Sequence, residues 1–275
     1  MHRRLALVLC LLAAACGREA PARRPVPPPA AVPVSVPAPP VAEPKFVCEN
    51  DWTKVSDGID YRMLNCSPDR ERFDLHLVRI DPKRTRIDAV LRPNSSAQAV
   101  AREGWKVALN ANFFDERKRP LGVVMSGGKE LNKAHVVSWQ SVFYVTKNDR
   151  ARIAPVLRWK DLRAGARTAA QAGPRIIVAG ERNRVARATP SWRTGVCIDG
   201  KGRAVLFATP RETLLDVEQM VDLADRAEDV GGMGCRDAML FDGGGSTALF
   251  IDRGARSVTI PGDRGVPAYL VVKSR

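Results

Sequence analysis

The residues best suited to chemistry lie in one short stretch, Asp242–Thr247. An acidic residue is followed there by three glycines and two hydroxyl residues, and the stretch lies between the apolar runs Ala238–Phe241 and Ala248–Ile251. Glycine lets another group approach the backbone closely, and successive N–H groups in such a turn can bind an anion. A linker or a plain turn would also be rich in glycine, but linkers are not normally bounded by two apolar runs. We therefore interpret Asp242 as a candidate catalytic carboxylate beside an anion-binding turn.

Two asparagines form a second candidate group. Asn110 and Asn112 lie at the end of an apolar run that begins at Val107. Residues two apart on a strand point to the same side, and their amides suit sugar hydroxyls, phosphate oxygens or a cation. From the residues alone, a role in stabilising the turn before Phe113 is equally open.

Four motifs, in this order, resemble the phosphodiester glycosidase family. They are Asn110–Phe114 followed by Gly122, then Gln171–Arg175, Arg193–Thr194 and Asp242–Ser246. The resemblance extends from about Val107 to the C-terminus. That family includes the enzyme that uncovers mannose 6-phosphate by removing N-acetylglucosamine, and many secreted bacterial relatives. The resemblance implies an α+β fold, with helices packed on a mixed β-sheet, and hydrolysis of a sugar 1-phosphodiester.

The resemblance also implies roles for individual residues. Asp242 is expected to act as base or nucleophile, with Arg193 on the phosphate and with Asn110 and Asn112 positioning the sugar. A divalent cation, Ca²⁺ or Mg²⁺, on Asp242 and the asparagines is left open. The further residues expected to contact substrate are Gly243, Gly244, Gly245, Ser246, Thr247, Thr194, Gln171 and Asp115.

The N-terminal residues favour export. A basic start is followed by the apolar run Leu5–Ala15, which is too short to span a bilayer and is typical of a signal peptide over residues 1–15. The end of this run resembles a bacterial lipobox with Cys16 as the lipidated residue, although ordinary cleavage remains open. The Pro-rich residues 16–45 are predicted to be an extended tether, and residues 46–275 a single domain. We expect a protein of the cell envelope, in the periplasm or at the outer membrane, anchored by lipid.

Four of the six cysteines lie outside this leader. An exported compartment permits disulfides, and proximity in sequence suggests the pairs Cys48–Cys66 and Cys197–Cys235, one of three pairings that four cysteines allow. The absence of a C-x-x-C spacing argues against zinc.

The net charge of the chain is +14. Residues 1–45 contain six Lys or Arg and two Glu, so about +10 remains for the predicted domain. Such a surplus favours anionic partners, and export argues against nucleic acid among them.

Hydrophobic patterns predict the elements that carry these residues. A helix over 95–103 with a capping box at Ser95, a helix over 161–170, and a helix that begins at Thr213 and ends at Gly231 are expected. The strand over 86–91 is expected to pair with the strand over 73–80. The other predicted strands cover 107–110, 122–125, 141–146, 176–178, 195–198, 204–207 and 266–272, with one more directly before Asp242.

These observations predict an exported hydrolase that cleaves a sugar from a phosphodiester-linked glycan of the N-acetylglucosamine 1-phosphodiester type. One alternative is a non-catalytic, glycan-binding envelope lipoprotein that keeps the same pocket. Another is a structural envelope protein that binds polyanions by charge alone. A serine triad through Ser246 and His135 lacks the G-x-S-x-G elbow, and no phosphate-binding loop of the G-x-x-x-x-G-K-[ST] type is present.

Overall fold

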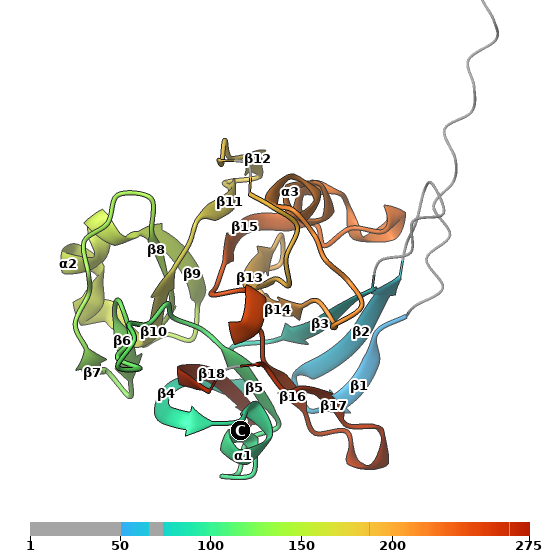
Figure 1. Cartoon of the computed structure of the whole chain (residues 1–275), viewed down its shortest axis with the longest axis horizontal. Helices are drawn as coiled ribbons and strands as arrows, with labels where there is room; N and C mark the ends of the chain where they lie inside the picture. The colour runs from blue at the N-terminus through green and yellow to red at the C-terminus, as the bar shows by residue number, and fades with distance from the viewer. Residues whose placement is uncertain (1–50, 66–73, 187, 264) are drawn as a thin grey trace, which may run out of the picture. The chain divides into compact units, whose positions relative to one another are not determined.

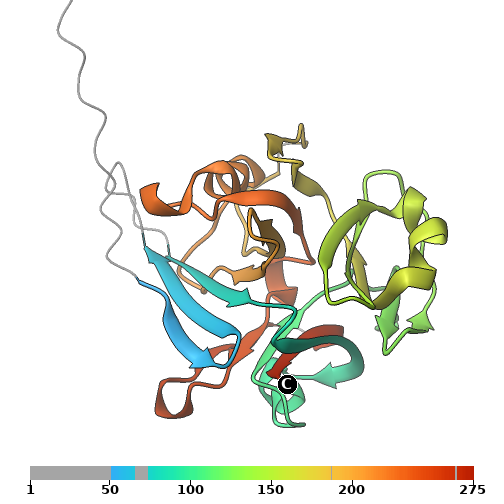
Figure 2. The same cartoon turned by 180° about the vertical axis from the view of Figure 1, so that it is seen from behind.

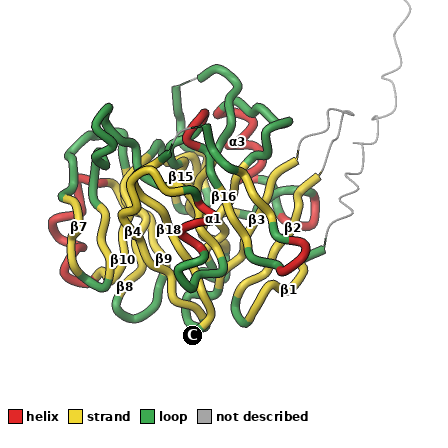
Figure 3. The backbone as a smooth tube through the Cα atoms, turned by 60° about the horizontal axis from the view of Figure 1, so that its bottom comes forward, coloured by secondary structure: helices red, strands yellow, loops and turns green. Residues whose placement is uncertain are grey.

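The computed structural model describes residues 51–65, 74–186, 188–263 and 265–275, which belong to one compact unit, Pro44–Arg275. Strands are the main regular structure of this unit and the helices are short (Figures 1 and 3). The predicted α+β class holds broadly, but three antiparallel sheets take the place of one mixed sheet. The predicted leader and tether, Cys16 and the Cys48–Cys66 pair lie outside the described residues. Within them, every helix is too short or too polar to cross a membrane.

The largest sheet carries the strand that leads to Asp242. This strand, β15 (Cys235–Leu240), lies between β13 (Thr194–Asp199) and β11 (Arg175–Val178), so three of the four motifs adjoin neighbouring strands. β13 pairs antiparallel with β14 (Ala204–Ala208), so the two strands predicted over 195–198 and 204–207 form a hairpin. The remaining strands are β3 (Asp74–Ile80), β2 (Ile59–Asn65) and β1 (Thr53–Ser56) beyond β14, and β12 (Glu181–Arg182) beyond β11.

The other two sheets have five strands each. In order, the second is β7 (Lys129–Asn132), β6 (Val124–Ser126), β10 (Ala166–Ala172), β8 (Ser141–Thr146) and β9 (Ala151–Pro155). The third is β17 (Val258–Ile260), β16 (Leu249–Ile251), β5 (Val107–Asn110), β18 (Val266–Ser274) and β4 (Thr85–Ser95).

The main hydrophobic core lies between the three sheets, since it joins Ile198 of the first, Phe143 of the second and Leu109 of the third. Two helices cover outer faces. The helix α3 (Val217–Asp225) packs Met220 and its apolar neighbours onto the first sheet. The short α2 (Trp159–Leu162) covers the second sheet (Figure 2), and its Trp159 is buried against that sheet. The third α-helix of the described residues is α1 (Ala97–Ala101). Short 3₁₀ turns are formed by Val156–Arg158, Arg163–Gly165, Glu228–Val230, Gly244–Ser246 and Gly254–Arg256.

The predicted helix over 161–170 is wrong. Residues Ala166–Ala172 form β10, which pairs with β6 on one side and β8 on the other. The alanines in this segment favour a helix in isolation, but the small side chains are buried in the middle of a sheet. Tertiary packing therefore overrides the local preference.

The predicted pairing of the strands over 73–80 and 86–91 is also wrong. β3 pairs with β2 and β14, whereas β4 pairs with β18 in a different sheet. An alternating pattern identifies a buried face but not the neighbouring strand.

Both predicted helix caps are misplaced. The helix α1 is capped by Ser96 rather than Ser95. The helix α3 is capped by Asp216, which forms a capping box with Gln219, and ends at Asp225, before Gly231. The Thr213 hydroxyl accepts instead from the Asp74 N–H.

One predicted disulfide is confirmed. Cys197 of β13 is bonded to Cys235 of β15, 38 residues later in the chain. The bond joins two neighbouring strands beneath α3, in the same sheet that leads to Asp242.

Candidate active site

The glycine-rich stretch begins where β15 ends, as predicted. The Phe241 N–H donates to the Thr194 carbonyl at 2.8 Å, and the Asp242 N–H donates to the Ala111 carbonyl at 3.1 Å. A 3₁₀ turn, Gly244–Ser246, then leads into β16. Asp242 itself is half-buried. The chain therefore presents this carboxylate at a junction between the first and third sheets.

Several backbone N–H groups of this turn are hydrogen-bonded within the protein. The N–H of Gly244 donates to the Trp192 carbonyl at 2.8 Å, and the N–H groups of Ser246 and Thr247 donate to carbonyls within the turn. A Cβ atom added to Gly243 would lie 2.5 Å from the Trp192 carbonyl oxygen. The glycines thus allow close packing against the segment before Arg193, and these three N–H groups are turned to the protein rather than to a ligand.

Asn110 braces the two ends of the glycine-rich stretch. Its side-chain nitrogen donates to the Asp242 carbonyl at 2.6 Å, and its side-chain oxygen accepts from the Ala248 N–H at 3.0 Å. The Thr194 hydroxyl donates to the same Asp242 carbonyl at 2.9 Å. Asn110 is only 1% exposed. The structure therefore places Asn110 and Thr194 around the backbone of Asp242, where they position it.

Asn112 and Gln171 lie on another side of the same junction. The Asn112 nitrogen donates to the Val123 carbonyl at 3.0 Å, and its buried oxygen has no protein partner. The fully buried Gln171 accepts from the N–H groups of Val123 and His135 and donates to the Gln140 side chain. Gln171 thus fixes the segment around Gly122, where an added Cβ would collide with it.

Asp115 is used within its own turn. Its carboxylate accepts from the N–H groups of Arg117 and Arg119 and from the Arg119 side chain. The backbone and side-chain hydrogen bonds from Arg119 lower the pKa of Asp115. Asp115 is absent from the wall of the cavity described next.

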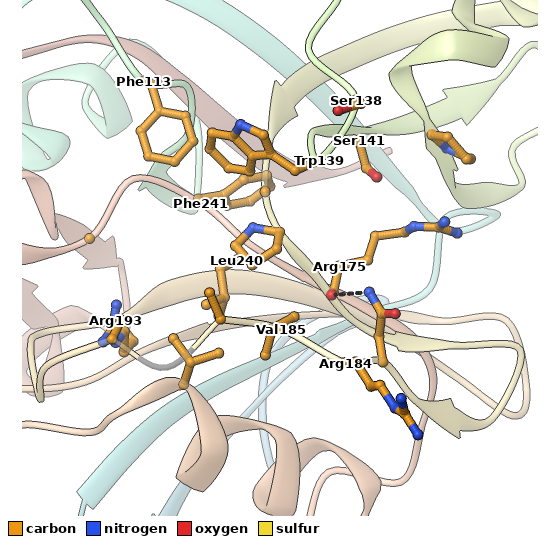
Figure 4. A pocket seen from close by; sticks show the side chains of 18 residues that line it. Phe113, Ser138, Trp139, Ser141, Arg175, Arg184, Val185, Arg193, Leu240 and Phe241 are labelled. Atoms are coloured by element: carbon orange, nitrogen blue, oxygen red, sulfur yellow. Dashed lines mark hydrogen bonds between the residues drawn. The ribbon is translucent and has the colours of Figure 1, made fainter. Parts of the chain in front are cut away.

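A cavity of about 560 Å³ adjoins the glycine-rich stretch (Figure 4). Phe241 and Gly243, the two neighbours of Asp242 in the chain, form part of its wall. The other residues that matter chemically are the arginines Arg175, Arg184 and Arg193 and the aromatic residues Phe113 and Trp139. Three cations and three aromatic rings therefore surround one space beside Asp242.

Arg193, like Gly243, is a predicted site residue that lies in the wall of this cavity. Its guanidinium donates to the Leu215 carbonyl at 2.8 Å and to the Thr189 carbonyl at 2.7 Å. Burial lowers the pKa of Arg193, and the nearby Asp216 acts in the opposite direction. A guanidinium has five N–H donors, so donors remain for a ligand after these two bonds are made.

The sequence interpretation missed Trp139 and Arg184. Trp139 is 51% exposed and stacks edge-on against Phe113, with ring centroids 5.7 Å apart. Arg184 reaches the cavity from the loop after β12. A single tryptophan or arginine in a polar segment gives no sequence signal that separates a site residue from a surface residue.

The donors expected for a divalent cation do not fit that role as a set. The side-chain nitrogen and oxygen of Asn110 are both hydrogen-bonded to backbone groups, of Asp242 and Ala248 respectively. In the described parts of the chain, no group of three or more His, Cys, Asp or Glu side chains could hold a metal ion.

Comparison with known proteins supplies the context for this geometry. The family model for phosphodiester glycosidases matches residues 103–273. No curated protein matches the sequence. The catalytic domain of zebrafish N-acetylglucosamine-1-phosphodiester α-N-acetylglucosaminidase, auto-inhibited by its pro-peptide, is similar in structure, with a TM-score of 0.61 and 15% identity over 83% of this chain and 89% of that one.

Two bacterial structures are similar as well. A hypothetical protein from Synechocystis gives a TM-score of 0.53 at 13% identity, over 84% of this chain and 68% of that one. A Burkholderia pseudomallei protein described as exported gives a TM-score of 0.52 at 13% identity, over 73% of this chain and 74% of that one. At these identities the structural similarity shows a shared fold.

Proposed function

Because this chain belongs to the phosphodiester glycosidase family, we propose that it is an exported hydrolase that releases a sugar from a phosphodiester-linked glycan. The substrate would be of the N-acetylglucosamine 1-phosphodiester type. Family membership supports a glycosidase-like hydrolase in general, and the cavity beside Asp242 supports the finer assignment.

The observation that carries the proposal is that the wall of this cavity combines arginines with aromatic rings. Arginine binds phosphate oxygens through charge-assisted and often paired hydrogen bonds, and aromatic rings provide flat apolar surfaces that suit the face of a sugar ring. The cavity volume of about 560 Å³ lies within the usual range for small-molecule sites, roughly 300–1,000 Å³. A sugar joined to a phosphodiester combines the two chemistries that the wall offers.

The reaction follows from this arrangement. Water attacks the anomeric carbon, the bond from that carbon to the phosphate oxygen breaks, and a phosphate monoester leaves with the bonding electrons. A carboxylate at Asp242 would either accept the proton from water or attack the anomeric carbon first. Phosphate is a good leaving group, so neutralisation of its charge by Arg193, Arg175 and Arg184 matters more than proton donation.

The remaining predicted site residues take supporting roles in this proposal. Asn110 and Thr194 hold the Asp242 backbone, and Gln171 fixes the wall behind Gly122. Asn112, whose buried side-chain oxygen has no protein partner, the buried Ser246 and the half-buried Gly245 stay candidates for substrate contact. The glycines of the motif contribute mainly by allowing the loop to pack closely.

We also propose export, with Cys16 as a lipid anchor in the cell envelope. The Cys197–Cys235 disulfide supports an oxidising compartment. The basic start and apolar run at the N-terminus support a signal peptide.

Substrate selectivity tests the proposal. The full chain would be assayed with an N-acetylglucosamine 1-phosphodiester and with the methyl glycoside of the same sugar. The phosphodiester should be cleaved with a kcat/KM at least about 100-fold higher, because the arginines stabilise only a charged leaving group. Equal rates on the two substrates would contradict the proposal, and binding without release would indicate a glycan-binding protein.

A further inference from the structure

A second cavity, of about 400 Å³, lies where three turns meet. The turns connect β3 to β4, β8 to β9 and β13 to β14. The cations in its wall are Lys83, Arg150, Arg152, Lys201 and Arg203, and the carboxylates are Asp81 and Asp149.

This cavity is separated from the candidate active site by the length of a strand, both along β13 and along β8. β13 begins at Thr194, which bonds to the Asp242 backbone, and ends at Asp199, where the turn lining the second cavity begins. β8 likewise begins at Ser141 in the wall of the first cavity and runs toward the turn of the second. Five steps along a strand cover about 17 Å. The two cavities therefore open at opposite ends of the same strands.

Two of the three acidic groups near the second cavity, Asp149 and Asp199, already have cationic partners. Asp149 pairs with Arg167 at 2.8 Å and with Arg275 at 2.5 Å. Asp199 pairs with Arg203 at 2.6 Å and caps its own turn. These carboxylates are thus neutralised by residues of the framework.

Four cations remain around the cavity. Among the residues that the structure describes, none of Lys83, Arg150, Arg152 and Lys201 has a carboxylate within ion-pair distance. Asp81, the other acidic residue of the wall, accepts from the backbone N–H of Lys83. Four like charges around a concave space repel one another, and a bound anion would relieve this repulsion.

We propose that this second cavity binds phosphate groups of an anionic polymer in solution. The inference rests on charge and shape at these three turns and does not depend on the reaction proposed for the first cavity. The concave wall suits a chain segment that enters it better than a flat bilayer. Of the described residues, no large hydrophobic side chain is exposed on these turns, and such side chains are what a membrane-surface protein inserts among lipids.

The test uses the full chain and tripolyphosphate as the probe, with binding followed by calorimetry at low ionic strength. The triple variant Lys83→Ala, Arg150→Ala and Lys201→Ala should bind about tenfold more weakly, because three exposed charge contacts are lost. The control, Arg102→Ala, Lys129→Ala and Lys160→Ala, removes the same charge from exposed positions outside both cavities and should change the affinity less than about twofold. Circular dichroism would verify that both variants are folded.

The outcomes separate specific binding from general charge. An equal loss in the two triple variants, or no loss in the first, would overturn the proposal. Vesicles containing anionic phospholipid form a second arm. Tight vesicle binding that the first triple variant abolishes, with tripolyphosphate binding unchanged, would assign the cavity to a lipid surface and would also overturn it.

Two further controls distinguish effects at the second cavity from effects at the first. The Arg184→Gln variant, altered only in the first cavity, should retain the tripolyphosphate binding that the Lys83, Arg150 and Lys201 changes remove. The titration requires no turnover, so it remains decisive if the proposed hydrolase activity fails. If the chain is active, the first triple variant should keep the wild-type kcat/KM on a small phosphodiester.

Discussion

The side-chain nitrogen of Asn110 donates to the backbone carbonyl of Asp242 at 2.6 Å, although the two residues are 132 positions apart in the chain. The Asn110 oxygen holds the Ala248 N–H in the same way. The last residue of β5, in the third sheet, is thereby hydrogen-bonded to both ends of the glycine-rich stretch. The location of the proposed catalytic carboxylate thus depends on contact between two sheets.

Replacing Asn110 should therefore affect stability and catalysis together. Asn110→Ala leaves the buried Ala248 N–H without its partner and leaves the Asp242 carbonyl with the Thr194 hydroxyl alone. We expect a loss of about 1–3 kcal/mol in the free energy of unfolding, with a lower kcat in the protein that remains folded. Urea denaturation and steady-state kinetics measure the two effects. Asn148→Ala, on an exposed turn, is the control and should cost less than about 0.5 kcal/mol. Wild-type behaviour of Asn110→Ala would show that the bond to Asp242 is dispensable.

Gly243 should not tolerate a side chain. In Gly243→Ala the new Cβ would meet the Trp192 carbonyl oxygen at 2.5 Å, so the loop must move away from the segment that carries Arg193. We expect kcat to fall at least about tenfold, since a small misplacement of catalytic groups is costly. Gly200→Ala is the matched control, because an added Cβ has nothing within 4 Å there. Equal activity of the two variants would rule out a tight packing requirement at Gly243.

Arg184 should contribute to substrate affinity. Arg184→Gln removes one of the three cations of the first cavity, and we expect KM to rise about five- to tenfold, with a smaller effect at high salt. Arg182→Gln provides the control, since Arg182 lies two positions earlier, pairs with Asp222 and is absent from this cavity's wall. A KM that rises equally in both variants would indicate general charge attraction rather than a contact in the cavity.

His76 should make stability depend on pH in a mildly acidic window. Burial lowers the pKa of His76 to about 4, although Asp74 and Glu212 act to raise it, and its ring bonds to the Tyr61 hydroxyl at 2.9 Å. The folded protein keeps His76 neutral, whereas the unfolded chain takes up a proton near pH 6.5. Stability should therefore decrease as the pH falls from about 6.5 to about 4, by up to about 3 kcal/mol from this residue.

The variant His76→Gln isolates this contribution, because glutamine can accept from the Tyr61 hydroxyl but does not titrate. The free energy of unfolding would be measured by urea at pH 7 and pH 4.5 for both proteins. The wild type should lose about 2.4 kcal/mol more than the variant between these values. The same loss in both would assign the pH dependence to other groups.

The sequence located the main elements around the site because their signals are local. The apolar runs on either side of Asp242 correspond to β15 and β16, and the strands predicted over 195–198 and 204–207 correspond to β13 and β14. In these strands the residues that decide the structure lie next to each other in the chain. The Cys197–Cys235 pair was also predicted, although 38 residues separate the two cysteines.

The errors arose where long-range packing decides the outcome. The alanine-rich segment at Ala166–Ala172 is a strand only because two other strands flank it. The backbone partners of Asn110 are also more than 130 positions away, so no local pattern indicates them. Trp139 and Arg184 line the cavity from segments that match no motif. Their place beside Asp242 is therefore visible only in the folded structure.

Sugar release by the wild type and Asp242→Asn tests the central claim most directly. The full chain would be incubated with an N-acetylglucosamine 1-phosphodiester, with and without a chelator, and free sugar would be measured over time. We predict release by the wild type and at least about a 1,000-fold lower rate for Asp242→Asn, with the variant still folded. Full turnover by Asp242→Asn would contradict the assignment of this carboxylate as the catalytic base or nucleophile.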